Sequence, residues 1–129
     1  MSPADRELIE LARPLVTNLT LGREDYSAAT VAAAIRTSRG NVFTGVCIHL
    51  SCGIGFCAEH AAAAEMIKAG ETRIDTIVAV ADDGLRSPCG RCREFLIQID
   101  PGNADATVIL AGPKEAKLRD LLPEHWMIH

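Results

Sequence analysis

The stretch IDTIVAVA, Ile74 to Ala81, is a nearly continuous apolar run of eight residues. Its length is that of a β-strand, and its lack of polar alternation is typical of a strand that is covered on both faces. A chain with such a strand needs helices on each side of its sheet. The run therefore favours a layered α/β fold.

The segments around this run carry signals for helices and strands. Ser2 and Pro3 are typical of an N-cap and a first helical residue, and Pro14 predicts the end of that helix near Arg13. Two apolar, partly β-branched segments flank the turn residues Gly40 and Asn41, which predicts a β-hairpin. The predicted hairpin strands are Thr30 to Ile35 and Val42 to His49. The later predicted elements are a helix over Cys57 to Gly70, a helix over Cys89 to Ile99, a strand from Ala106 and a short helix near Leu118 to Leu122.

This order predicts one domain over residues 1–129, without internal repeats or linkers. Strands that alternate with helices imply right-handed crossovers. We expect a three-layer α/β/α sandwich around a mixed sheet of five strands or fewer, with mostly parallel pairing after the hairpin.

Charge and composition narrow the class of partner. The formal net charge is −4 at pH 7 and no run of Lys or Arg occurs, whereas a nucleic-acid partner normally requires a basic face. The N-terminus lacks a signal-peptide pattern, and no apolar run reaches the roughly 18 residues of a membrane span. We expect a cytoplasmic protein with a small-molecule partner, no nucleic-acid partner and no membrane partner.

Three of the five cysteines fall where helices are predicted to begin. Cys57 opens one helix, and Cys89 and Cys92 lie in the first turn of the next. Helix N-termini favour thiolates, and three thiolates can bind zinc with a fourth position left open. The pair in CGRC alone would equally fit a redox or structural role. Cys47 and Cys52 are more typical of small buried residues.

Charged side chains near these cysteines could support catalysis. Glu59 follows Cys57 by two residues, so it should lie near a bound metal without being a ligand, where it could exchange protons with a water. Arg91 and Arg93 are candidates for offsetting thiolate charge. His60 is a candidate for a hydrogen bond to a ligand sulfur.

The combined pattern resembles a known family. Zinc nucleobase deaminases carry H-x-E…P-C-x-x-C, with a variant in which cysteine replaces the histidine. This chain has CAE from Cys57 and PCGRC from Pro88. It resembles the small, three-cysteine members of the cytidine deaminase superfamily over nearly its whole length. The PCGRCR form and the LLP ending with an aromatic residue are similar to blasticidin-S deaminase.

The resemblance implies a zinc-dependent aminohydrolase and a set of site residues. Cys57, Cys89 and Cys92 would hold the zinc, and Glu59 would transfer protons while water displaces ammonia from C4 of a cytosine-like ring. The resemblance also implies substrate contacts and a homotetramer or homodimer, in which a C-terminal aromatic enters a neighbouring subunit's site. The expected contacts are Ala58, Ser87, Pro88, Cys47, Tyr26 and Trp126.

One segment departs from the family pattern. Nucleoside-specific members carry N-x-E in the strand before the zinc cysteine, where the Asn and Glu bind ribose hydroxyls. Counting back from Cys57 places Val46 and Ile48 there, whereas counting forward from the TG pair places Cys47 at the Asn position. Neither register contains the Asn–Glu pair, so we expect plain cytidine to be a poor substrate.

Three functions stay open at this level. The first is a deaminase of a cytosine-like ring in a base, a modified nucleoside or a nucleoside antibiotic. The second is a deaminase of another amino-heterocycle, such as a purine or a pterin-like base. The third is a zinc-stabilised oligomeric binding protein without turnover, against which Glu59 argues, because a structural zinc site gains nothing from a carboxylate beside it.

Overall fold

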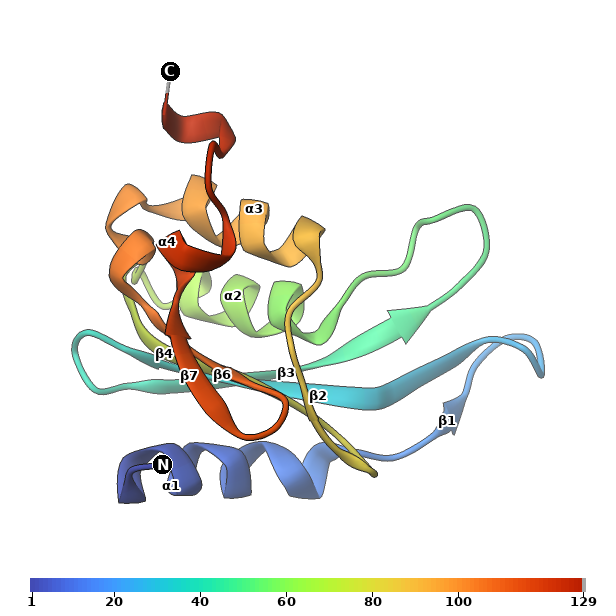
Figure 1. Cartoon of the computed structure of the whole chain (residues 1–129). Coiled ribbons are helices and arrows are strands. Elements are labelled where there is room, and N and C mark those ends of the chain that lie inside the picture. The colour runs from blue at the N-terminus through green and yellow to red at the C-terminus, as the bar shows by residue number, and fades with distance from the viewer. Residues whose placement is uncertain (129) are drawn as a thin grey trace.

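The computed structural model describes residues 1–128 and has three layers (Figure 1). A mixed β-sheet forms the middle layer. Helix α1 (Pro3–Ala12) covers one face, and α2 (Ala58–Lys68), α3 (Gly90–Ile99) and α4 (Leu118–Leu121) lie over the other. The predicted α/β/α sandwich is therefore confirmed.

The sheet has more strands than the sequence predicted. Four strands correspond to predicted segments: β2 (Ser27–Thr37), β3 (Val42–His49), β4 (Ile74–Ala81) and β6 (Thr107–Leu110). Three short strands bring the total in residues 1–128 to seven, namely β1 (Leu19–Thr20), β5 (Gly84–Arg86) and β7 (Lys114–Lys117). The prediction of five strands or fewer was wrong, because these two- to four-residue strands pair without an apolar pattern of their own.

The strand pairing also differs from the predicted, mostly parallel pairing. The path through the sheet is β1-β2-β4-β6-β7, while β3 pairs with β2 and β5 pairs with β4. Strand β2 is antiparallel to both β3 and β4, so it separates two strands that a helical crossover connects. Within residues 1–128 only β4 and β6 pair in parallel. The expectation of mostly parallel pairing was wrong.

The first helix begins where the sequence predicted. The Ser2 hydroxyl accepts a hydrogen bond from the Asp5 N–H at 3.1 Å, and Pro3 takes the first helical position. A 3₁₀ turn, Arg13–Leu15, follows the helix. Leu8 is fully buried in a cluster with residues of β2 and β4. One face of the sheet is thereby covered.

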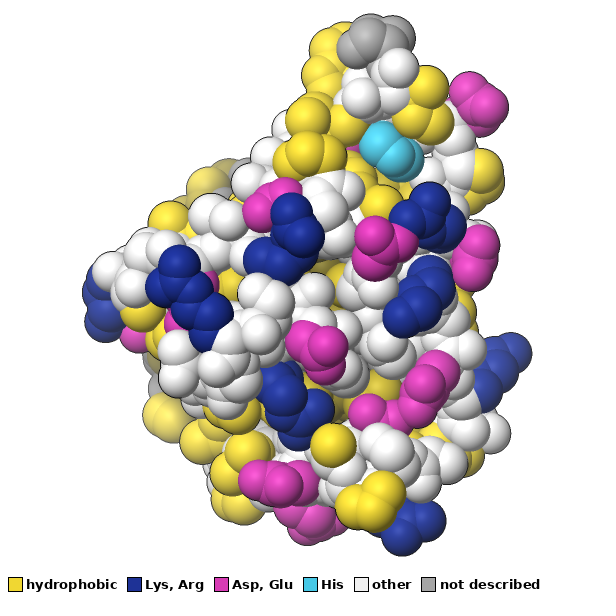
Figure 2. All heavy atoms as spheres, turned by 90° about the vertical axis from the view of Figure 1, so that its left-hand side faces the viewer, with side chains coloured by type: hydrophobic (Ala, Val, Ile, Leu, Met, Phe, Trp, Pro, Cys, Tyr) yellow, Lys and Arg dark blue, Asp and Glu magenta, His cyan; other side chains and the backbone are white. Residues whose placement is uncertain are grey.

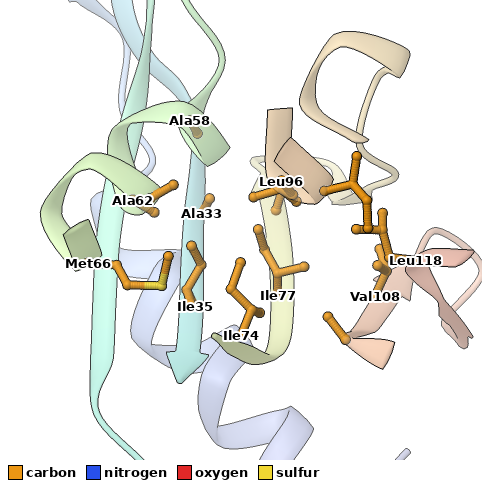
Figure 3. Packing of buried hydrophobic residues seen from close by; sticks show 14 of the residues in the cluster. Ala33, Ile35, Ala58, Ala62, Met66, Ile74, Ile77, Leu96, Val108 and Leu118 are labelled. Atoms are coloured by element: carbon orange, nitrogen blue, oxygen red, sulfur yellow. The ribbon is translucent and has the colours of Figure 1, made fainter. Parts of the chain in front are cut away.

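Helix α2 packs very closely against the other face (Figure 3). Its inward residues Ala58, Ala62 and Met66 are fully buried in the larger core cluster. Gly45 of β3 lies directly beneath, and a Cβ atom there would be 2.4 Å from the Ala62 backbone nitrogen. The alanine run after His60 thus permits close packing, and this packing sets the position of the α2 N-terminus.

The surface carries mixed charges, and the helices are short. Figure 2 shows Lys and Arg side chains interspersed with Asp and Glu on one face, and hydrophobic side chains on the projecting C-terminal segment. None of the helices within residues 1–128 has the length and hydropathy required to cross a membrane.

Candidate active site

Three cysteine sulfurs lie together at two helix N-termini. Cys57 is the N-cap of α2, Cys89 is the N-cap of α3, and Cys92 is buried in the first turn of α3. The Sγ atoms of Cys57 and Cys89 are 3.7 Å apart, and those of Cys89 and Cys92 are 3.5 Å apart. All three sulfur atoms lie within 4.8 Å of one another. The cluster could hold a metal ion.

The spacing fits zinc in particular. Zn–S bonds of about 2.3 Å in a tetrahedron place sulfurs about 3.8 Å apart. The Cys57–Cys89 and Cys89–Cys92 sulfur separations, 3.7 and 3.5 Å, are close to that value. All five cysteines are free thiols, and a third sulfur beside the CGRC pair favours a metal site over a redox pair.

The surroundings affect the three thiols differently. Burial raises the pKa of the Cys57 and Cys92 thiols. Burial also acts on Cys89, but hydrogen bonds with Cys92, with the Cys57 thiol and with the Arg91 backbone outweigh it and leave the pKa of this thiol below its ordinary value. Thiolate formation is therefore easiest at Cys89, and the two other thiols need a positive charge beside them to ionise.

Glu59 lies in the first turn of α2 and is only 5% exposed. Burial raises the pKa of its carboxyl group above the ordinary value. It lines the same cavity as Cys57 and Cys89. A carboxyl group of this kind, next to candidate metal ligands, can hold and release a proton under mild conditions.

His60 and Arg93, two of the residues expected to support the thiolates, differ in what they contact. His60 Nδ1 is 3.5 Å from Cys92 Sγ, and its ring stacks on Phe95 with centroids 4.0 Å apart. Arg93 donates through Nε to the Pro88 carbonyl at 2.9 Å and through Nη1 to the Leu121 carbonyl at 3.1 Å. His60 therefore contacts the sulfur as expected, whereas Arg93 ties the loop before α3 to the end of α4.

A cavity of about 410 Å³ opens at these helix N-termini. This volume lies within the usual range for sites that bind small molecules, roughly 300–1,000 Å³. Three of the expected substrate contacts, Cys47, Ala58 and Ser87, line it together with Glu59. The Ser87 hydroxyl also accepts a hydrogen bond from the Ala111 N–H at 3.2 Å.

The other three expected contacts lie outside the wall of this cavity. The Pro88 carbonyl is bound by Arg93. The Tyr26 hydroxyl is 2.6 Å from the Ser51 hydroxyl, so it connects the loop before β2 to the loop after β3. Trp126 is 65% exposed, and its backbone N–H donates to Glu94 Oε1 at 3.2 Å.

The structure distinguishes the two registers of β3. Val46 packs towards the core cluster beneath α1, on the opposite face of the sheet from α2. Cys47 lies on the cavity wall, where its sulfur accepts the Val31 N–H at 3.3 Å, and Ile48 and His49 follow it there. Sequence reasoning treated His49 as a strand-end residue and did not consider Arg86, which also lines the cavity. Of the two counts made from the sequence, only the forward count from the TG pair placed Cys47 at the position of the family's Asn.

Comparison with known families decides the assignment. Residues 4–108 match the family model described as the cytidine and deoxycytidylate deaminase zinc-binding region. This range contains all three clustered cysteines and Glu59. The chain belongs to this family.

Individual relatives support the membership. A probable cytidine deaminase from Dictyostelium discoideum is 37% identical over 76 residues, which cover 57% of this chain and 52% of the relative. The match thus spans about half the length of that relative. A cytidine deaminase structure from Burkholderia pseudomallei has a TM-score of 0.76 at 28% identity, with 98% of this chain and 100% of that chain covered. The cytidine deaminase structure from Mycobacterium tuberculosis has a TM-score of 0.79 at 25% identity, with 97% and 98% covered.

Proposed function

We propose that the protein is a zinc-dependent hydrolytic deaminase of a cytosine-like ring. One observation carries the proposal: the three-sulfur cluster and the buried Glu59 lie beside one cavity of about 410 Å³, which Cys57, Cys89 and Glu59 line. Cys57, Cys89 and Cys92 would hold the zinc. The relatives whose names state an activity are called cytidine deaminases, which supports the same reaction class.

The proposed reaction replaces an amino group by oxygen. Zinc, when bound, supplies an acidified water as the attacking nucleophile. Glu59 would take one proton from that water and give it to the neighbouring ring nitrogen, and it would then take the remaining hydroxyl proton and give it to the departing amine. The C4–N bond breaks as C4 gains a carbonyl oxygen, so that one water is consumed and one ammonia is released.

The first turn of α2 and the loop before α3 would orient the ring. Ala58 is the first residue of α2, where backbone N–H groups lack intrahelical partners and can donate to a substrate. Ser87 faces the same cavity from the loop before α3. A ring held between these two segments would present its amino-bearing carbon to Glu59 and the metal.

The finer features of the proposal concern substrate and assembly. A blasticidin-S-type nucleoside is one substrate within the class, and a homotetramer or homodimer would bring Trp126 of a neighbouring subunit to the cavity. Exposed Trp126 and Ile128 on the C-terminal segment are compatible with such a contact. We propose that residues 1–129 act as one catalytic domain in the cytoplasm.

Glu59→Gln tests the chemistry. The variant should keep its zinc and its melting temperature while turnover falls by at least about a hundredfold, the usual scale for a positioned acid–base group. Glu65→Gln is the matched control, since Glu65 lies on the same helix and pairs with Lys68 at the surface. Metal analysis and ammonia release over a panel of cytosine, purine and pterin compounds complete the test. If the parent protein binds zinc but turns over none of these compounds, the protein is a zinc-binding protein without deaminase activity. If the zinc-loaded Glu59→Gln variant turns over normally, Glu59 has no part in the mechanism.

A further inference from the structure

A bulge in β2 lies opposite Cys47 on the cavity wall. The pairing of β2 with β3 shifts register between Ala28 and Ala32, so three residues of β2 stand opposite Cys47 alone. Ala29, the first of the three, has a φ of 68°, a left-handed conformation that alanine rarely adopts. Bulges of this kind redirect groups beside functional sites. The contacts of Cys47 show which groups this bulge redirects.

The bulge uses the hydrogen-bonding capacity of the Cys47 sulfur. The Val31 N–H donates to this sulfur at 3.3 Å, and the Thr30 hydroxyl lies 3.3 Å from it. A thiol offers only one weak donor and one weakly accepting sulfur. Because Cys47 is also only 3% exposed, it presents a small surface with its polar capacity already used.

The backbone groups beside Cys47 are satisfied as well. The Ile48 N–H donates to the Phe56 carbonyl at 3.0 Å, and the Phe56 N–H donates to the Ile48 carbonyl at 3.0 Å. Both residues line the cavity, as Val31 does. A ligand therefore finds no free N–H group at Val31, Ile48 or Phe56.

The side chains on this part of the wall are hydrocarbon. The residues of β2, of β3 and of the loop after it that line the cavity beside Cys47 and His49 are Val31, Ile48, Leu50, Gly53, Gly55 and Phe56. Val31 packs against the core cluster, which explains its apolar side chain. Leu50 is 37% exposed, so core packing does not explain this leucine. An exposed leucine beside a cavity is suited to cover an apolar group of a ligand.

Most of the polar lining side chains belong to the reacting end of the cavity. They come from the start of α2 and from the segment that leads into α3, namely Cys57, Glu59, Ser87, Cys89 and Arg91. Arg86 already donates to Asp83 at 2.6 Å. His49 is then the one strongly polar side chain among the described lining residues of β2, β3 and the loop up to Phe56. One imidazole cannot pair with all the hydroxyl groups of a sugar, and each unpaired hydroxyl would oppose binding.

We infer that the cavity selects an amino-heterocycle whose ring substituent is apolar, a hydrocarbon group in place of a sugar, packed against Val31, Leu50 and Phe56. Burial of such a group is favourable in proportion to its apolar area, and it leaves no hydroxyl unpaired. This inference rests on the proposed function and specifies its substrate class.

Kinetics on a homologous series test the inference. The panel contains cytidine and three cytosines that carry a methyl, a propyl or a benzyl group on the ring nitrogen to which a sugar would be attached. Each buried methylene should raise kcat/KM by roughly fourfold, so the propyl compound should exceed the methyl compound by about tenfold or more. The propyl and benzyl compounds should also exceed cytidine. A value for cytidine that equals or exceeds both, or no rise from methyl to propyl, would overturn the inference while leaving deamination intact.

Variants assign the effect to the apolar residues. Leu50→Asn and Val31→Thr should each lower the ratio of kcat/KM for the propyl compound to that for cytidine by roughly threefold or more, since each makes the wall polar. Val31→Thr keeps the shape of the side chain, and Leu50→Asn changes a loop residue, so the two variants stress the fold differently. Leu11→Asn is the matched control, because Leu11 is 43% exposed on α1, away from the cavity wall. Parental ratios in both folded variants would contradict the assignment.

Product binding separates this inference from the proposed function. Calorimetry on the zinc-loaded protein compares uridine with the methyl and propyl uracils. Tighter binding of the propyl compound, with a negative heat-capacity change, supports the inference even if no compound of the panel is deaminated. Equal or tighter binding of uridine overturns it.

Discussion

Gly45→Ala should displace the helix that carries half of the candidate site. Gly45 lies in β3 beneath α2, and an added Cβ would be 2.4 Å from the Ala62 nitrogen and 2.6 Å from the Ala61 Cβ. Both atoms belong to the helix backbone or are fixed to it, so no flexible side chain can move aside. The helix would have to shift by roughly 1 Å to reach an ordinary contact distance of about 3.5 Å.

Overpacking of this kind typically costs about 1–3 kcal/mol. For a chain of this size the loss corresponds to a melting temperature lower by roughly 4–15 °C. The same shift moves Cys57, which caps α2, relative to Cys89 and Cys92 on α3. Zinc affinity should therefore fall together with stability.

The assay combines thermal unfolding of the metal-free protein with a chelator competition for zinc. Gly22→Ala is the control, because nothing lies within 4 Å of a Cβ at that position. The control should change the melting temperature by no more than about 2 °C, the scale of a surface substitution. A Gly45→Ala protein with parental stability and parental zinc affinity would refute the close-packing argument.

Two further predictions address the metal and the core. Cys89→Ala should lose its zinc and part of its stability, because metal binding is coupled to folding. The control Cys52→Ala, at an exposed loop position, should keep both. Full zinc retention by Cys89→Ala in metal analysis would exclude Cys89 as a ligand. Asn103→Leu should lower the free energy of unfolding by about 3 kcal/mol or more, since the buried Asn103 side chain satisfies three backbone groups at 2.8–3.1 Å. Urea denaturation measures this loss, and a change below about 1 kcal/mol would contradict it.

Much of the fold could be predicted because its strongest signals are local. The apolar run from Ile74 to Ala81 coincides with β4, and the Ser2–Pro3 cap starts α1 as expected. The cysteine pattern likewise placed Cys57 and Cys89 at helix starts. Each of these signals depends on neighbours within a few residues, so the sequence alone contains it.

The features that could not be predicted from the sequence depend on residues far apart in the chain. Strand β7, Lys114–Lys117, has three charged residues among its four and forms only by pairing with β6. The insertion of β2 between β3 and β4 is a property of the whole sheet. For the same reason Arg86 and His49 could not be recognised as neighbours of one cavity.

The register of β3 shows this limit at the site itself. Counting along the sequence left two alternatives for the positions of the family's ribose-binding pair. The backward count from Cys57 gave Val46 and Ile48, and the forward count from the TG pair gave Cys47 at the Asn position. The structure puts Cys47, Ile48 and His49 on the cavity wall, and it puts Val46 against the cluster beneath α1. The two positions of the forward register therefore hold a thiol and an imidazole, one residue away from the backward count.

The double variant Cys47→Asn/His49→Glu should consequently gain efficiency with cytidine. Each new charge-assisted or amide hydrogen bond to a ribose hydroxyl is worth roughly 1–3 kcal/mol, so kcat/KM for cytidine should rise by at least about tenfold. The single variant Val46→Asn is the control, because Val46 does not line the cavity. It should show no gain and a lower melting temperature, because it places an amide where Val46 packs against apolar residues. A gain in the control and none in the first variant would show that the other register faces the substrate.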